Sequence, residues 1–196
     1  MNSFRPRILF VTGNRNKFAE ASLVAEGYGV DLVQETRVEK LEIQAENTEQ
    51  VASYAAKHAY AALNSPLVVE DTGLHVRCLN GFPGVYASYV FQTIGLTGLL
   101  KVMGDCEDRS AVFDCCVVYQ DSHRTKLFHG VLEGRILKEP AGSFGFGYDP
   151  IFAPDSHPNV SLASLSTQEK NSLSHRAKAF SKLFDWLSRA NEPAGQ

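Results

Sequence analysis

The sequence predicts an α/β fold with a mixed, partly antiparallel sheet. Ile8–Val11 is a short apolar run, followed by a polar glycine turn and a helical pattern over about residues 18–26. This strand–turn–helix order is typical of α/β proteins. Val30–Val33 has the pattern of a second strand, and Leu67–Val69 that of a further, buried one. Two further strand patterns, Ser110–Tyr119 and Lys126–Leu137, flank a short polar turn and indicate an antiparallel hairpin.

The chain has 196 residues, which is enough for one domain with a full core, so we expect a single domain, with or without two lobes, over residues 1–196. Hydrophobic residues make up 44% and charged residues 21%, as in ordinary globular proteins. The net charge of −3 argues against nonspecific binding of nucleic acid. A local basic pocket for a small nucleotide remains compatible with it.

The cysteines and the N-terminus predict a cytoplasmic protein. The four cysteines lack metal-ligand spacing, and Cys115 and Cys116 should alternate between the faces of a strand as reduced core residues. Met1–Arg7 is too polar for a signal peptide, and no apolar run approaches transmembrane length. We therefore expect neither a membrane nor a nucleic acid as partner.

A polar turn follows the first strand. In Thr12-Gly13-Asn14-Arg15-Asn16-Lys17, backbone N–H groups and a helix N-terminus would point at an anion. The hydroxyl, amide and ammonium groups of Thr12, Asn14 and Lys17 could bind phosphate, although the spacing is not that of a P-loop. Taken alone, the same residues also suit an ordinary turn.

Two adjacent carboxylates follow the strand at Leu67–Val69. We expect Asp71-Thr72-Gly73 to form the turn that closes this strand. Ligands of α/β proteins bind beyond the carboxyl ends of strands, where paired carboxylates suit Mg²⁺ or a general base. The structural alternative is that Asp71 caps the turn and Glu70 is solvated.

Further candidates lie in the acidic segment Glu39–Glu46 and the helix after it. Most of these carboxylates should be solvated, but apolar neighbours on both sides could anchor Glu42 at the edge of the core. The helix should start at Asn47, with Gln50 three positions later. Lys57 lies off the centre of its apolar stripe, either on the surface or within reach of a cleft.

The loop Gly142–Pro150 is rich in glycine and aromatic residues. Phe146 and Tyr148 could sandwich a nucleobase, and Asp149 could read its edge. The alternative is a structural turn with aromatic residues in the core.

The last helix should begin at the capping box Ser166-Thr167-Gln168-Glu169 and run through Leu187. On its helical wheel, Lys170 and Arg176 flank the buried stripe. His175 points away from that stripe and would reach a cleft only across a second lobe or a bent backbone.

Five ordered motifs cover nearly the whole chain. They are Thr12-Gly13-Asn14-x-x-Lys17, Glu70-Asp71-Thr72-Gly73-Leu74, Gly81-x-Pro83-Gly84-Val85-Tyr86, Phe146-Gly147-Tyr148-Asp149-Pro150 and Glu169-Lys170-Asn171-x-x-Ser174-His175-Arg176. With them the chain resembles the inosine triphosphate pyrophosphatase family, which hydrolyses noncanonical purine nucleoside triphosphates.

The resemblance implies a two-lobed fold, with a twisted mixed sheet, flanking helices and a central nucleotide cleft, in a homodimer. It also implies Mg²⁺-dependent hydrolysis of ITP, dITP and XTP to the monophosphate and pyrophosphate, which removes deaminated purines from the nucleotide pool.

By the same resemblance, Asp71 is the catalytic carboxylate and a metal ligand together with Glu42, for which Glu39 and Glu46 are the neighbouring alternatives. Thr72 lies beside the substrate. The implied triphosphate-binding residues are Thr12, Gly13, Asn14, Arg15, Asn16, Lys17 and Lys57. Those implied for the base are Phe146, Gly147, Tyr148, Asp149, Lys170, His175 and Arg176.

In the implied mechanism Asp71 activates a water that attacks the α-phosphorus, and pyrophosphate leaves. Donors such as His175 and Arg176 could pair with O6 of hypoxanthine or xanthine and leave the 6-amino group of ATP unpaired.

Three other functions fit part of the sequence. Asp71-Thr72-Gly73 matches the aspartic protease signature, but that enzyme needs a second such acid or a symmetric dimer on a β-rich frame. A pyrophosphatase for modified pyrimidine or methylated nucleotides would use similar chemistry. A nucleotide sensor without turnover would not need Lys17, Glu70 and Asp71 together.

Overall fold

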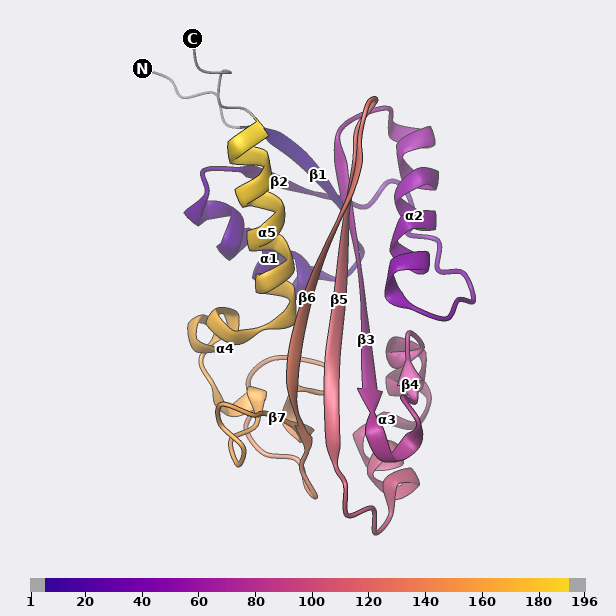
Figure 1. Ribbon diagram of the computed structural model, residues 1–196, viewed down its shortest axis with the longest axis vertical. Helices are drawn as coiled ribbons and strands as arrows, with labels where there is room; N and C mark the ends of the chain where they lie inside the picture. Colours follow the sequence, from indigo (N-terminus) through magenta and orange to yellow (C-terminus); the bar gives the residue numbers. More distant parts are fainter. Residues whose placement is uncertain (1–5, 191–196) are drawn as a thin grey trace.

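A computed structural model describes residues 6–190 and shows one mixed sheet with helices on both faces (Figure 1). The strand order is β2-β1-β3-β5-β6-β7, and the short β4 pairs with β3. The strands are β1 (Arg7–Val11), β2 (Asp31–Glu35), β3 (Leu67–Val76), β4 (Pro83–Gly84), β5 (Ser110–Gln120), β6 (Thr125–Ile136) and β7 (Phe152–Pro154). The α-helices are α1 (Arg15–Gly27), α2 (Thr48–Leu63), α3 (Ala87–Met103), α4 (Thr167–Leu173) and α5 (His175–Ala190).

The predicted mixed sheet is confirmed. β1 pairs in parallel with β2 and β3, whereas β3, β5, β6 and β7 are antiparallel to one another. The predicted hairpin is the β5–β6 pair, in which Ser110 faces Arg135 and Gln120 faces Thr125.

The prediction of a turn at Asp71-Thr72-Gly73 is wrong. β3 continues through these residues to Val76, with Asp71 opposite Cys116 and Thr72 opposite Cys115 on β5. An unbroken antiparallel partner gives each of these residues a place in the ladder, and this long-range pairing overrides the local turn preference of Asp and Gly. The carboxylates therefore project from the middle of a rigid strand.

Strand pairing along the other edge of β3 is interrupted. β1 pairs there with Leu67 and Val68, and β4 pairs with Leu74 and His75. Within residues 6–190, no strand covers positions 69–73 on this edge. The stretch that carries the two carboxylates thus lies in a gap between β1 and β4.

The helices cover the two faces of the sheet with separate core clusters. α1 and α5 pack on one face, where Phe180 and Phe184 join Cys115, and α2 packs on the other, where its alanines join Cys116. The predicted alternation of the two cysteines is confirmed, and both thiols are buried and free. A third cluster lies at the other end of the sheet and includes Leu99 of α3.

Several helix boundaries follow their sequence signals. The side chain of Asn47 caps α2 by accepting from the Gln50 N–H, and Asn64 ends it in a left-handed conformation (φ 47°). Ser166 and Glu169 form the capping box of α4.

The prediction of one continuous last helix is wrong. Ser174 has extended backbone (φ −66°, ψ 148°), which separates α4 from α5. Its hydroxyl accepts a 3.0 Å hydrogen bond from the Ala177 N–H and so caps α5. The bend turns His175 inward, where it is 3% exposed.

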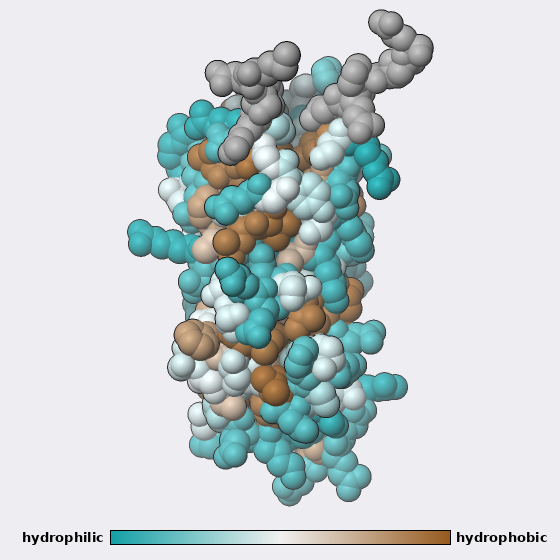
Figure 2. Space-filling model, turned by 90° about the vertical axis from the view of Figure 1, so that its left-hand side faces the viewer, coloured by the Kyte–Doolittle hydropathy of each residue, from teal (hydrophilic) through white to brown (hydrophobic). Residues whose placement is uncertain are grey.

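On the side of the molecule seen in Figure 2, apolar residues show between hydrophilic ones across the middle of the surface. Over the part of the chain that the structure describes, no helix combines the length and apolarity needed to span a bilayer. The expectation about Met1–Arg7 falls mainly on residues outside that part.

Candidate functional site

A cavity of about 670 Å³ lies at the gap in the sheet, between β1 and the middle of β3. Its walls come from the β1–α1 turn, the segment after β2, the edge of β3, the start of α3, the loop before β7, and the α4–α5 bend. Lining residues that the sequence predicts are Thr12, Gly13, Asn14, Asn16, Lys17, Glu42, Asp71, Thr72, Phe146, Gly147, Tyr148, Asp149, Lys170, His175 and Arg176. Segments far apart in sequence thus meet at one cavity.

Two predicted triphosphate-binding residues lie outside the cavity lining. Arg15 is exposed on α1, and Lys57 is exposed on α2, which covers the opposite face of the sheet from α1. Their contact with substrate stays a prediction.

The β1–α1 turn is built by local hydrogen bonds. The Asn14 amide oxygen accepts from the N–H groups of Asn16 (3.0 Å) and Lys17 (3.1 Å), so it caps α1. The Thr12 hydroxyl oxygen accepts from the Asn14 N–H at 3.1 Å. The amide NH₂ of Asn14, rather than its oxygen, is therefore the group left to meet a ligand.

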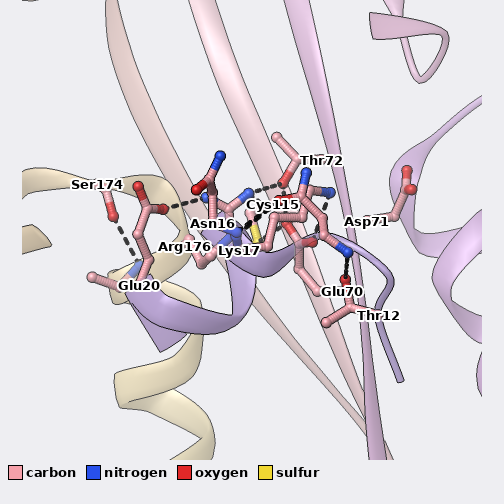
Figure 3. Close-up of polar contacts among 12 residues, drawn as sticks. Thr12, Asn16, Lys17, Glu20, Glu70, Asp71, Thr72, Cys115, Ser174 and Arg176 are labelled. Atoms are coloured by element: carbon pink, nitrogen blue, oxygen red, sulfur yellow. Dashed lines mark hydrogen bonds and ion pairs between the residues drawn. The ribbon is translucent and has the colours of Figure 1, made fainter. Parts of the chain in front are cut away.

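Glu70 lies in a dense cationic network (Figure 3). Its carboxylate is fully buried, 2.8 Å from Lys17 Nζ and 3.0 Å from Arg176 Nη2, and it accepts a short hydrogen bond from the Thr72 hydroxyl. Burial alone would raise the pKa of Glu70, but the charges of Arg176 and Lys17 hold that pKa well below its ordinary value. Glu70 is therefore a permanent anion that orients these two cations, and the alternative of a solvated Glu70 is wrong.

Asp71 points to the other side of β3 (Figure 3), as expected for the next residue of a strand. Its Oδ1 is 2.6 Å from Lys40 Nζ, while Oδ2 is buried and accepts no hydrogen bond. Burial raises the pKa of Asp71 above its ordinary value, and Lys40 and Lys17 only partly oppose this. A carboxylate with a raised pKa and a vacant oxygen can take a proton or bind a cation.

The donor set fits a magnesium ion carried with a polyphosphate. Glu42 also faces Lys40, with Oε1 2.9 Å from Nζ, so Asp71 and Glu42 approach the same point of the wall. Residues 6–190 hold no cluster of three or more His, Cys, Asp or Glu side chains that could bind a metal. Mg²⁺ needs no such cluster, because it binds through one or two carboxylates plus phosphate and water oxygens.

The loop before β7 places its residues differently from a base sandwich. Tyr148 is 4% exposed, and its hydroxyl donates to the Ala87 carbonyl at 2.9 Å while its ring packs edge-on against Phe91. Tyr148 is thus held in the core with one side toward the cavity. Phe146 is half-buried, with Lys170 Nζ 4.6 Å from its ring centroid.

Asp149 is engaged by its own surroundings. Its Oδ2 accepts from the Phe146 N–H at 2.7 Å and lies 2.5 Å from Lys170 Nζ. These bonds fix the loop against α4. Burial raises the pKa of the Asp149 carboxyl, and the Lys170 charge opposes that rise.

The α4–α5 bend delivers His175 and Arg176. The His175 ring stacks on Phe113 (4.6 Å between centroids, 16° between planes), and burial lowers its pKa well below the ordinary value. It is neutral at pH 7, and its buried Nδ1 has no hydrogen-bond partner. Arg176 directs Nη1 to Glu20 at 2.5 Å and Nη2 to Glu70.

Sequence reasoning missed Lys40 and Glu20. Glu20 is buried on α1 and pairs with Lys170 (2.6 Å) as well as Arg176. The sequence could have indicated this residue, because Glu20 lies one helical turn after Lys17 and its side chain is therefore on the same side of α1. Lys40 precedes Glu42 by two residues in an extended segment, a spacing that puts both side chains on one side.

The family model described as "Ham1 family" matches residues 8–186. A protein named dITP/XTP pyrophosphatase from Hyperthermus butylicus is 44% identical over 186 residues, covering 95% of this chain and 97% of that protein. A protein of the same name from Methanopyrus kandleri is 40% identical and covers 97% and 100% of the two chains.

Solved structures of similar proteins have the same fold as this chain. The HAM1 protein from Coxiella burnetii superposes with a TM-score of 0.81 at 31% identity, covering 94% of this chain and 99% of that one. A structure described as nucleoside-triphosphatase / dITP/XTP pyrophosphatase from Mycobacterium abscessus gives a TM-score of 0.71 at 31% identity over 92% and 99% of the two chains. These similarities confirm the resemblance argued from the five motifs, and the chain belongs to the Ham1 family.

Proposed function

We propose that this protein hydrolyses noncanonical purine nucleoside triphosphates, namely dITP, ITP and XTP, to the monophosphate and pyrophosphate. Relatives at 40–44% identity carry the name dITP/XTP pyrophosphatase. The observation that carries the proposal is the cavity in which the carboxylate of Asp71 and the turn at Thr12–Lys17 share a wall with His175 and Phe146. One cavity thus holds groups for phosphate, water and base.

Asp71 is the proposed general base. A water near its vacant Oδ2 would lose a proton to the carboxylate as it attacks the α-phosphorus, and the pyrophosphate group would leave. The raised pKa of Asp71 moves the carboxyl toward the working pH, which improves a base. A divalent ion, which we propose to be Mg²⁺ held by Asp71 and Glu42, supplies charge neutralisation for the phosphate oxygens when bound.

The end of the cavity that contains His175 and Phe146 supports selection for a nucleotide whose purine carries an oxo group at position 6. His175 is neutral, so one ring nitrogen donates and the other accepts a hydrogen bond. We propose that the ring nitrogen of His175 that carries the proton donates a hydrogen bond to O6 of hypoxanthine or xanthine. The 6-amino group of adenine would meet that donor with another donor, and a buried mismatch of this kind is strongly rejected. Phe146 provides the stacking surface.

The proposal extends to the form of the enzyme. We propose that residues 1–196 act as one domain with two lobes, that two copies form a homodimer, and that the enzyme works in the cytoplasm beside its nucleotide pool. Light scattering at micromolar concentration would give about twice the monomer mass if the dimer is correct, and the monomer mass would contradict it.

A nucleotide panel tests the reaction. We expect dITP, ITP and XTP to be hydrolysed at kcat/KM values at least ~100-fold above that for dATP, with equal amounts of monophosphate and pyrophosphate. The products should be separated by ion-exchange chromatography. Equal rates on dATP and dITP, release of orthophosphate alone, or a preference for modified pyrimidine or methylated nucleotides would contradict the proposal.

A further inference from the structure

Lys40 lies between the two carboxylates to which the proposed function assigns the metal. Its Nζ is 2.6 Å from Asp71 Oδ1 and 2.9 Å from Glu42 Oε1. The lysine side chain is only 11% exposed, so its ammonium lies inside the cavity wall. A single cation therefore bridges Asp71 and Glu42.

This pair of carboxylates needs a positive charge when no divalent ion is bound. Asp71 is 7% exposed at its side chain, so water screens it little. The Glu42 side chain is 57% exposed, so water partly screens the repulsion between the two carboxylates, and the buried Asp71 is the one that most needs a positive charge nearby. The Lys40 ammonium compensates this repulsion in the nucleotide-free protein.

The other cations that line the cavity make their ion pairs with other acids. Lys17 pairs with Glu70, and Lys170 pairs with Asp149. Arg176 is also bound to Glu70. Within residues 6–190, Lys40 is therefore the ion-pair partner of both Asp71 and Glu42.

We propose that Lys40 is a positioning residue that occupies the metal position in the free enzyme and yields it when a metal–nucleotide complex enters. The inference rests on the proposed function, because it takes Asp71 and Glu42 as the metal ligands. A divalent ion bound to the same oxygens would repel the ammonium at close range. The flexible four-carbon chain lets Lys40 turn toward the incoming triphosphate, whose negative charge replaces that of the carboxylates.

Metal and nucleotide then bind with positive coupling. In the nucleotide-free enzyme a metal ion has to displace an ammonium that is paired with both Asp71 and Glu42. With the triphosphate present the ammonium has a new partner, so the same metal ion binds more tightly. By thermodynamic linkage the metal raises the nucleotide affinity by the same factor.

Mn²⁺ titration followed by electron paramagnetic resonance tests this device without turnover. In nucleotide-free protein, Lys40→Gln should bind Mn²⁺ at least about tenfold more tightly than the parent protein, because the competing charge is gone. Lys126→Gln, which removes an exposed lysine from β6, should leave the affinity unchanged. With a nonhydrolysable dITP analogue bound, the parent and Lys40→Gln should approach the same Mn²⁺ affinity.

Lys40→Arg separates loss of charge from loss of structure. It keeps a cation on the carboxylates, so its nucleotide-free Mn²⁺ affinity should match that of the parent. Equal affinities of nucleotide-free parent and Lys40→Gln, or tight binding by Lys40→Arg, would overturn the role of Lys40. If Asp71→Asn binds Mn²⁺ with nucleotide as well as the parent does, the metal assignment in the proposed function fails, and this inference fails with it.

Discussion

At the scale of single residues, Glu70 and Asp71 show how two adjacent carboxylates take different roles. Successive strand residues point to opposite sides, so Glu70 faces Arg176 and Lys17 while Asp71 faces Lys40. The pKa of Glu70 is held well below its ordinary value, whereas burial raises that of Asp71. Of the two, Asp71 is the group whose charged form is less stabilised by its surroundings, and it is therefore the better acceptor of a proton.

Replacing Asp71 by Asn should therefore remove catalysis and keep binding. We expect kcat for dITP to fall by ~10²–10⁴, the usual contribution of a general base, while nucleotide affinity in calorimetry stays measurable. Glu70→Gln is the matched comparison, and it should chiefly lower the free energy of unfolding, because it removes the buried partner of Arg176. Near-normal kcat in Asp71→Asn would assign the base to another acid.

The sequence predicts the residue types of the candidate site better than it predicts which of these residues pair with one another. Asp71, Thr12 and Lys17 belong to short motifs that suit ordinary turns when taken alone, and it is their order along the chain that indicates phosphate and metal chemistry. Glu20 and Lys40 lie in segments without such a motif, and their contacts are long-range: Glu20 pairs with Lys170, 150 positions away in the chain. Local spacing can place Glu20 on the face of Lys17 and Lys40 beside Glu42, but it does not indicate a partner as distant as Lys170.

At the scale of elements, two predictions from local sequence pattern are wrong. Asp71-Thr72-Gly73 has the composition of a turn, yet β5 pairs with it residue by residue. The pattern from Ser166 to Leu187 suits one helix, yet Ser174 breaks it and caps the second. At the first place pairing with a distant strand decides the backbone, whereas at the second a local hydroxyl cap separates the two helices, and in both the average propensity of the residues is only a weak guide.

α5 lies directly on β6 at Gly130, and this contact sets the position of the helix that carries His175. A Cβ at Gly130 would overlap the carbonyl oxygen of His175 and lie 2.7 Å from the Ala179 nitrogen. Gly130→Ala should push α5 outward, lower the free energy of unfolding by about 1–3 kcal/mol in urea titrations, and reduce activity with it.

Gly27→Ala is the control for Gly130→Ala. A Cβ at Gly27, the last residue of α1, would meet no atom within 4 Å. Its stability should be equal to or slightly above that of the parent, since Ala is the better helix residue. A Gly130→Ala protein as stable and active as Gly27→Ala would show that α5 does not depend on this contact.

Glu35 at the end of β2 anchors the segment that leads to Lys40. Its Oε1 accepts from the Arg37 N–H at 2.7 Å, and its carboxylate lies 2.5 Å from the Arg37 guanidinium. These hydrogen bonds lower the pKa of Glu35 from 4.5 to about 2. A lowered pKa in the folded protein stabilises it above the unfolded value of 4.5, and this stabilisation is lost as the pH falls toward 2.

Glu35→Gln should therefore destabilise the protein at pH 7 more than at pH 3. Arg37 is mostly exposed, so solvent screening limits the loss at pH 7 to about 1–2 kcal/mol. Urea titrations of both proteins at the two pH values give the comparison. A difference in unfolding free energy that does not shrink from pH 7 to pH 3 would mean that the charge of Glu35 contributes nothing.

At the scale of the whole molecule, the site results from an incomplete sheet. β5 holds β3 rigid along one edge, while β1 and β4 leave positions 69–73 uncovered on the other. The cavity occupies that gap, so the carboxylates of a stiff central strand meet the turn after β1 and the bend before α5. The sheet provides rigidity, and the loops around the gap provide the chemistry.

The most direct test of the proposed reaction is hydrolysis of dITP in water enriched in ¹⁸O, with mass spectrometry of both products. Attack of an Asp71-activated water on the α-phosphorus predicts one ¹⁸O atom in the deoxyinosine monophosphate and none in the pyrophosphate. Label in the pyrophosphate, or orthophosphate as the labelled product, would contradict that reaction.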